Sequence, residues 1–450
     1  MRTAAFQEWR RQPPFSRAGG STQEHPCASL TAGLPERIDM RTRDCMAWTW
    51  LLPAICVLIL TMGVPARAQH QPTFTTIDAR LAGGSSGYGT EVIVMNPAGV
   101  ATGYYVGYDN IVHAYVRTPD GTLIPIDGPR CPAGQTVQCV PYSLPDSDDP
   151  YSPPNSWLNT NAPGTYGAAV DAMGAVAGYY VDANGAAYGY VRAPDGAFTS
   201  FSVSGAGTQA GQGTFAVNMN LEGMIAGYYV DAQNGWHGFV RARDGAITPF
   251  DPPDGIGSTW TGWAGCINTA GAVAGGYFDS NGLSIGFVRK PGGKFETFAY
   301  MDPNQNQDLA AWSGQGTNMW AINAAGASVG TFVDANNTNH GLVRTADGKI
   351  TVFDAPRAPA GANTVSESID DDGAVAGFYN DANGVHHGFL RSADGKFTYF
   401  DDPAGGDQFH QGTVPLYNHA DTIAGFYEDA NYVWHGFIRN GADWHGFDWK

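Results

Sequence analysis

The stretch VAGFYNDANGVHHGFLRSADGKFTYFD, residues 375–401, decides the fold. It holds three short runs rich in Val, Phe and Tyr, separated by Asn383-Gly384 and Asp394-Gly395. Asn-Gly and Asp-Gly supply the positive-φ residues of tight hairpins. In other copies of the pattern a Gly-Thr pair opens a further apolar run upstream, as from Gly316 to Asn323. The pattern therefore predicts four consecutive antiparallel strands.

This unit recurs along the chain. One arginine ends each His-Gly-Phe-like run, and the spacings between successive copies are 75, 49, 48, 55, 47 and 48 residues. Four short strands in about 48 residues is close to the period of a propeller blade. The repeat position is occupied by Arg117, Arg192, Arg241, Arg289, Arg344, Arg391 and Arg439.

The expected fold is all-β, a seven-bladed β-propeller of four-stranded antiparallel blades. One such sheet cannot bury both of its faces, whereas radial stacking buries each face against a neighbour. A parallel β-helix is the alternative, but its coils are shorter and lack repeated hairpins. Phe74 to Asp78 resembles the fourth strand of a blade, so we expect it to close the ring against His435 to Arg439. The segment from Trp444 to Asp448 competes for that place.

The start of the chain has the pattern of an export signal. A basic segment at Met40 to Arg43 precedes an apolar run from Trp48 to Val64, and Ala66-Arg67-Ala68 fits a cleavage site. We therefore expect residues 1–39 to be a non-native or unstructured extension, 40–68 a signal peptide, and 69–450 one propeller domain with a loop insertion at 128–163. The expected location is secreted or periplasmic, and a retained membrane anchor is the alternative.

The repeated signature Asn-x-x-Gly-x-Val-x-Gly-x-Tyr, followed by His-(Gly/Ala)-(Phe/Tyr), resembles the extracellular HAF-repeat proteins. The tripeptide stands here as His113-Ala114-Tyr115 and His387-Gly388-Phe389. The resemblance covers roughly residues 73–448. It implies an exported bacterial protein and carries no catalytic residues that transfer to this chain.

Charge and cysteines restrict the partners. With 42 acidic against 24 basic residues the formal net charge is −18, so nucleic acid and anionic membranes are poor partners once the signal is removed. Cys131 and Cys139 lie close together in the insertion and could form a disulfide in an oxidising compartment. Cys266 lies in an apolar segment and is expected to be a small buried side chain. No spacing typical of a zinc site occurs, so no metal is expected.

Two repeated features have a structural interpretation. Residues recurring in every blade are spread around a ring and cannot meet at one ion, so we expect these histidines to bond within their own blades. They are His113, His237, His340, His387 and His435, replaced by Tyr188 and Ile285 in the other two copies. The Asp-x-Asn-Gly turns are explained by turn chemistry, with calcium binding as the alternative. No cofactor is expected.

The candidate site comes from residues that interrupt the repeat. Connections from a fourth strand to the next blade emerge on one face together with the turns between second and third strands, and loops of this kind carry function. Aromatic rings stack on sugar faces, and amides bond hydroxyls. The expected ligand-binding residues are Trp157, Trp260, Trp263, Trp312, Gln212, Gln315, Gln411, Arg130 and Arg357.

Three functions remain open. The first is a monomeric binding protein for an extracellular ligand, a glycan in preference to a protein. The second is a polysaccharide-cleaving enzyme. A hydrolase would use two carboxylates, with Asp146, Asp148, Asp149 and Asp308 as candidates. A lyase would use His410 or Tyr142 as base, with Arg130 or Arg357 neutralising the uronate. The third is a non-catalytic surface or matrix scaffold.

Overall fold

The computed structural model describes residues 72–84, 86–109, 111–128, 164–255, 257–262, 265–300, 315–420 and 422–441. All of them belong to one compact unit, Ala68–Lys450. The described chain is all-β, and no helix long and apolar enough to cross a membrane occurs within it. The prediction of an all-β fold is confirmed.

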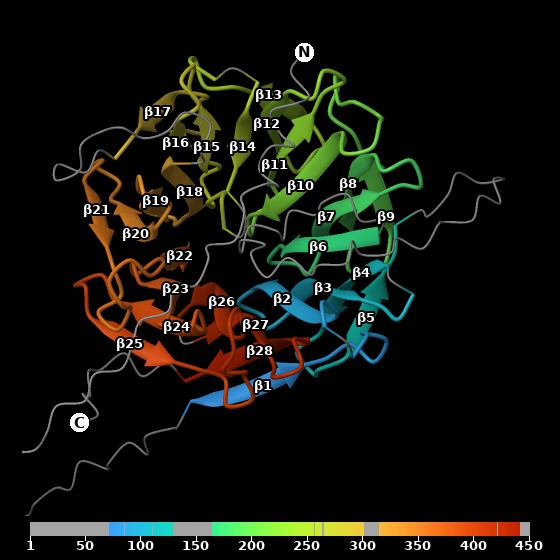
Figure 1. The fold of residues 1–450 in the computed structure, drawn as a ribbon. Coiled ribbons are helices and arrows are strands. Elements are labelled where there is room, and N and C mark those ends of the chain that lie inside the picture. The colour runs from blue at the N-terminus through green and yellow to red at the C-terminus, as the bar shows by residue number, and fades with distance from the viewer. Residues whose placement is uncertain are drawn as a thin grey trace, which may run out of the picture. The chain divides into compact units, whose positions relative to one another are not determined.

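Each of the first six sequence repeats forms an antiparallel meander of four strands, and the seventh forms three; we number them repeats 1 to 7 in chain order (Figure 1). The strands of the first four repeats are β2 (Gly89–Met95), β3 (Ala101–Val106), β4 (Val112–Arg117) and β5 (Leu123–Ile126); β6 (Gly164–Val170), β7 (Val176–Val181), β8 (Ala187–Arg192) and β9 (Phe198–Phe201); β10 (Gly213–Met219), β11 (Ile225–Val230), β12 (Trp236–Arg241) and β13 (Ile247–Phe250); β14 (Thr259–Thr261), β15 (Val273–Phe278), β16 (Ser284–Arg289) and β17 (Phe295–Phe298).

The last repeat borrows its outer strand from the start of the chain. Repeat 5 contains β18 (Gly316–Ile322), β19 (Ser328–Val333), β20 (Asn339–Arg344) and β21 (Ile350–Phe353); repeat 6 contains β22 (Thr364–Ile369), β23 (Val375–Asn380), β24 (His386–Arg391) and β25 (Phe397–Phe400); repeat 7 contains β26 (Gly412–His419), β27 (Thr422–Glu428) and β28 (Trp434–Asn440). β1 (Thr73–Ile77) pairs with β28 from Thr73 opposite Asn440 to Ile77 opposite Gly436. The expected closure by the N-terminal strand is confirmed, and Trp444 to Asp448 lies outside the described residues.

Neighbouring repeats touch where each first strand begins, beside the second-to-third-strand turn of the preceding repeat. In five repeats a glycine opens the first strand and pairs in parallel with the first residue of the preceding repeat's third strand, as Gly316 does with Ser284. In repeat 4 Ser258 takes the place of the glycine and pairs with Trp236. Gly89 makes the same contact with Trp434, so repeat 7 meets repeat 1. Together these contacts give a propeller-like arrangement in which the first strands face a common centre (Figure 1).

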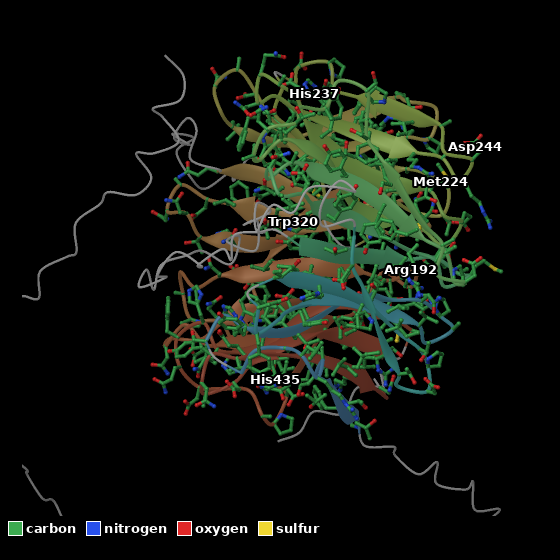
Figure 2. All side chains as sticks on the ribbon, turned by 90° about the vertical axis from the view of Figure 1, so that its right-hand side faces the viewer. Arg192, Met224, His237, Asp244, Trp320 and His435 are labelled. Atoms are coloured by element: carbon green, nitrogen blue, oxygen red, sulfur yellow. The ribbon has the colours of Figure 1, made fainter. Side chains whose placement is uncertain are left out.

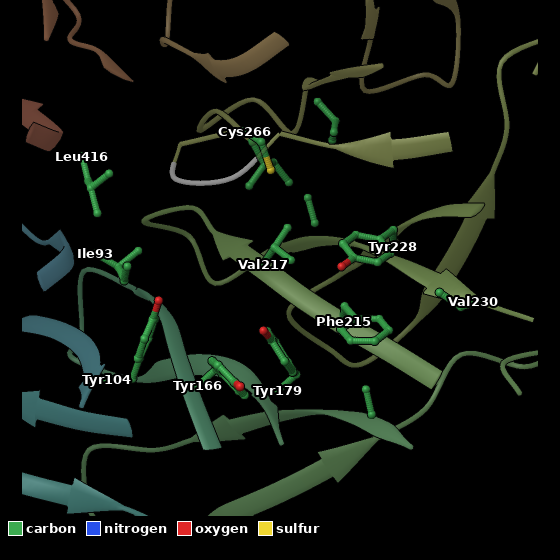
Figure 3. Packing of buried hydrophobic residues seen from close by; sticks show 14 of the residues in the cluster. Ile93, Tyr104, Tyr166, Tyr179, Phe215, Val217, Tyr228, Val230, Cys266 and Leu416 are labelled. Atoms are coloured by element: carbon green, nitrogen blue, oxygen red, sulfur yellow. The ribbon is translucent and has the colours of Figure 1, made fainter. Parts of the chain in front are cut away.

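Buried side chains from many repeats pack together in one cluster. A run of rings passes from Tyr104 to Tyr166, Tyr179 and Phe215, with centroid separations of 5.3, 4.6 and 5.2 Å (Figure 3). These residues belong to one buried cluster that also takes in side chains of repeats 4, 6 and 7. Cys266 belongs to this cluster and is fully buried, as its apolar surroundings in the sequence predict.

The repeated arginine joins one repeat to the one before it. Arg241 lies over the ring of Phe201 at 4.9 Å, and Arg391 lies over Phe353 at 4.6 Å. Each phenylalanine ends the fourth strand of the preceding repeat, so the contact is a cation–π interaction that joins two neighbouring sheets. Arg289, Arg344 and Arg439 make the same contact.

The threonine after the opening glycine holds the incoming connection. Thr214 Oγ1 accepts the backbone N–H of Val203 at 2.9 Å, and Thr413 Oγ1 accepts that of Asp402 at 2.8 Å. In repeat 4 the corresponding donor position is Pro252, which has no N–H. Thr259 Oγ1 is accordingly buried without a partner among the described residues.

We expect Gly316→Ala to lower the free energy of unfolding by about 2 kcal/mol or more. Gly316 has φ +114°, and an added Cβ would lie 2.3 Å from the carbonyl oxygen of Ser284. Denaturant unfolding measures the change. Gly292→Ala is the control, because a Cβ there has no neighbour within 4 Å. Equal stability of the two variants would contradict the close contact between Gly316 and Ser284.

Thr214→Val is expected to cost about 1–2 kcal/mol, because it leaves the buried Val203 N–H without an acceptor. Thr259→Val removes a hydroxyl that has no partner among the described residues, so we expect it to be neutral or stabilising. Thermal unfolding of the two variants tests this difference. A larger loss for Thr259→Val would show that its hydroxyl is bonded after all.

Candidate functional site

One face of the unit carries the turns between second and third strands and the connections that lead to the next repeat; we call it the loop face. Hydrogen bonds lock these segments together. Gly406 N donates to Glu428 O at 2.8 Å, and Gly87 N donates to Tyr432 O at 3.0 Å. In Figure 2, His237 and His435 lie toward one side of the unit, whereas Met224 and Asp244 lie on the other.

The second-to-third-strand turns begin with an aspartate that is engaged by the backbone. Asp381 Oδ1 accepts the N–H of Asn383 at 2.8 Å and that of Val385 at 2.9 Å. These bonds help to lower the pKa of Asp381, against the effect of its partial burial. The carboxylate oxygen is thus part of the turn itself. No cluster of three or more potential metal ligands occurs in the described part of the chain.

The repeated histidines bond within their own repeats, as predicted. His237 Nδ1 lies 2.7 Å from Asp251, at the end of the fourth strand, and Nε2 lies 3.4 Å from Asp231 in the turn. The remaining Nδ1 contacts join His113 to Asp127, His340 to Asp354, His387 to Asp401 and His435 to Asp78.

The two repeats without this histidine also lack its partner. Tyr188 and Ile285 stand at the histidine position, and Ser202 and Ala299 stand where the aspartate would be. A change at one position is matched at the other, because an unpaired carboxylate beside an apolar side chain would be unfavourable. This paired change is present in the sequence and supports the structural role of the histidines.

The Gln-Gly-Thr glutamines differ in their partners. Gln212 Nε2 donates to Asn234 Oδ1 at 2.9 Å, and Gln315 Nε2 donates to Asn337 Oδ1 at 3.1 Å. Both amides therefore stabilise the second-to-third-strand turn of their own repeat. Gln411 is fully buried, and its Nε2 has no partner among the described residues, because Tyr432 stands where repeats 3 and 5 have the asparagine.

The proposed lyase pair is separated by a sheet. Arg357 lies over the Tyr399 ring at 4.2 Å on the side of repeat 6 where Tyr379 stacks with His387. His410 instead lies 5.5 Å from the His386 ring. His386 and His387 are consecutive in β24 and project to opposite faces. The described contacts therefore place His410 and Arg357 on opposite faces of repeat 6 and do not bring them together.

Trp260 is largely used in packing. Its ring covers Gly276, where an added Cβ would lie 2.6 Å away, and contacts the Phe278 ring at 4.9 Å. The other predicted residues fall outside the described part of the chain: Arg130, Cys131, Cys139, Tyr142, Asp146, Asp148, Asp149, Trp157, Trp263, Asp308 and Trp312.

The structure reveals an apolar sector of the loop face that the sequence reasoning missed. Leu81, Tyr108, Phe409 and Tyr432 are exposed by 62, 73, 42 and 37%. They occupy successive turns and connections of repeats 6, 7 and 1, and Tyr108 N donates to Leu81 O at 3.3 Å. We call these four residues the aromatic sector. Its sequence signal is departure from the turn pattern, since Tyr432 replaces the usual Gly or Asn.

Burial creates unusual acids and bases. Glu91 is buried in β2 beside the Tyr104 hydroxyl, and desolvation raises its pKa to about 7. Glu428, at the end of β27, accepts a bond from Trp434 Nε1 at 3.1 Å, and burial raises its pKa to about 7 as well. Desolvation lowers the pKa of His386 to about 3, so its imidazole is neutral.

A hollow lies on the opposite face, between repeats 7 and 1, and is lined by Arg117, Tyr417 and His419 among others. It is remote from the turns and connections of the loop face. Ring exposure, unusual acids and the unpaired amide all occur on the loop face or at the centre. We therefore place the candidate site there and not in the hollow.

Comparison with known proteins gives only distant likenesses. No family model matches the chain, and no curated protein matches it. Among solved structures, a streptogramin B lyase shares 13% identity at a TM-score of 0.47, covering 83% of this chain and all of the other. Virginiamycin B lyase of Staphylococcus aureus gives 12% and 0.46, covering 81% and 99%. The BP39L lectin of Burkholderia pseudomallei gives 11% and 0.42, covering 76% and 92%. These likenesses are too distant to transfer a function.

We expect the unit to be less stable at pH 8 than at pH 6. Aspartates raise the folded-state pKa of four histidines, so their contribution is present below pH 6.5 and is lost as pH rises through the folded value. Glu91, Glu367 and Glu428, with pKa about 7, add to the loss because they must ionise while buried. His386 and His410, whose pKa values are lowered, oppose the trend.

Thermal unfolding measured between pH 6 and 8 tests whether stability falls as the pH rises. Glu91→Gln should make the dependence shallower, because it removes one of the buried acids. Constant or rising stability across the window would contradict the assignment.

Proposed function

We propose that the protein is a secreted seven-bladed β-propeller whose loop face binds an extracellular glycan. The blade count is supported by the seven meanders and by the Gly89–Trp434 contact between the last and the first. Secretion is supported by the signal-like segment before residue 69. The binding role is supported by the exposed rings on the loop face.

The aromatic sector is the observation that carries the binding role. Large apolar side chains exposed together on a soluble protein mark an interaction site more often than scattered ones do. Three of the four side chains are rings, and they alternate with polar groups such as Gln408 and Asn431. Sugars offer an apolar ring face bordered by hydroxyls, which suits this mixture.

Hydrolysis of the bound glycan is a second candidate function, favoured by Glu428. A carboxyl group with a pKa near 7 can hold a proton at neutral pH and deliver it to a leaving oxygen. Glu428 ends the strand that leads into the Tyr432 turn, so it adjoins the aromatic sector. Release of reducing ends that disappears in Glu428→Gln, with binding retained, would establish this activity.

The binding proposal is tested with the unit 68–450 on a glycan panel, measuring affinity and release of reducing or unsaturated ends. Phe409→Ala and Tyr108→Ala should each weaken binding about 5- to 20-fold, because each removes one stacking ring. Met173→Ala is the matched control, since Met173 is 70% exposed but belongs to a first-to-second-strand turn on the opposite face. Absence of binding to every glycan would favour the scaffold interpretation and overturn the proposal.

A further inference from the structure

We infer that the corner between the connection 402–411 and the turn 429–433 is the main sugar subsite and accepts neutral sugars. Tyr432 is its stacking platform, and the Gln411 amide is its hydrogen-bond donor. The inference rests on the proposed function and deepens it. It assigns a ligand class to one part of the loop face.

The first support is a comparison of the repeats with one another. In repeats 3 and 5 the amide N–H of the glutamine before the opening glycine donates a hydrogen bond to Asn234 or Asn337. In repeat 7 the glutamine keeps its position, and its Oε1 still accepts the Gln408 N–H at 3.0 Å. Its buried Nε2 has lost the partner. A buried donor without an acceptor costs stability unless something supplies one.

The second support is the backbone of Tyr432. Its φ is +60°, a conformation that Gly and Asn adopt readily and that residues with bulky side chains rarely adopt. The same turn position holds Gly384, Asn234 or Asn337 in other repeats. Tyr432 thus combines a strained backbone with a lost hydrogen bond and an exposed ring. Strain retained in this way is typical of positions used for recognition.

The third support is a file of rings that leads inward from the surface. Phe409 lies 4.2 Å from the His410 ring, His410 lies 5.5 Å from His386, and His386 lies 4.8 Å from Phe378. His386 is 6% exposed, and its Nε2 has no partner among the described residues. A neutral imidazole nitrogen can accept from a hydroxyl or donate to it, depending on the tautomer. Hydroxyl groups suit both His386 and Gln411.

The charges around the corner select against acidic sugars. Asp407 belongs to the connection, Asp429 begins the turn and has a lowered pKa because the turn's backbone N–H groups bond its carboxylate against the effect of burial, and the whole chain has a formal charge of −18. Arg357 is engaged with Tyr399 on the far side of repeat 6. Arg80 belongs to the connection on the other side of the Tyr432 turn. A uronate placed in the corner would meet carboxylates without a cation from either corner segment.

The decisive variant is Tyr432→Asn, which recreates the Gln–Asn pair of repeats 3 and 5. We expect the affinity of unit 68–450 for neutral hexasaccharides of glucose, mannose or galactose to fall at least 10-fold. We expect its apparent Tm to rise by about 2 °C, because strain and the unpaired amide are both relieved. A purely structural role for Tyr432 would not combine lost binding with gained stability.

Asn337→Tyr is the matched control, because it makes the reverse change in repeat 5. It should lower Tm and leave glycan affinity unchanged. Oligogalacturonate of the same length should bind at least 10-fold more weakly than the best neutral hexasaccharide. Normal binding by Tyr432→Asn, or preferential binding of oligogalacturonate, would overturn the inference. If Phe409→Ala and Tyr108→Ala still weaken binding in that case, the proposed function stands and only this subsite fails. Wild-type protein that binds no glycan, or only a protein, would overturn both.

Discussion

The contact between two backbones at the start of each first strand is the constraint on which the rest depends. A glycine with positive φ opens the first strand and lies against a carbonyl of the preceding repeat's third strand, as Gly213 does at Ala187. An added Cβ at Gly213 would lie 2.1 Å from the carbonyl oxygen of Ala187, whereas repeats 4 and 6 carry Ser258 and Asn363 at this position. Once this distance is set, the arginine reaches the phenylalanine of the preceding repeat and the threonine reaches the incoming connection. The Gly, Thr, Arg and Phe of the repeat thus serve one junction.

Much of this architecture is predictable from the sequence, because a repeated pattern identifies turns and strands many times over. The Asn-Gly and Asp-Gly turns and the N-terminal fourth strand are found where the sequence places them. The role of the repeated arginine was not predictable in the same way. Arg241 contacts Phe201, which lies in another repeat, and spacing within one repeat does not indicate contacts between two. The absence of this contact at Arg117 and Arg192 follows from Ile77 and Ile126, which offer no ring.

The site was predictable only in part. Sequence reasoning selected the loop face, where we place the candidate site, and included Gln411 and His410, but it grouped three equivalent glutamines of which two are used in turns. It also joined His410 with Arg357, although the β22–β25 sheet lies between them. The informative signal was the exception within the repeat. Tyr432 breaks a turn rule, and that break frees the amide of Gln411.

Closure by β1 has a consequence for how the molecule is made. Thr73, near the beginning of the described chain, must find Asn440, near its end, before the last sheet has its outer strand. Contacts between such distant residues slow folding, because the entropy of closing a long loop is lost before the stabilising contacts form. Until that step the outer edge of β28 is an unpaired strand that other chains can join. A nascent or nicked chain that lacks the first strand would therefore be prone to edge-to-edge association, and intact termini protect the finished protein from it.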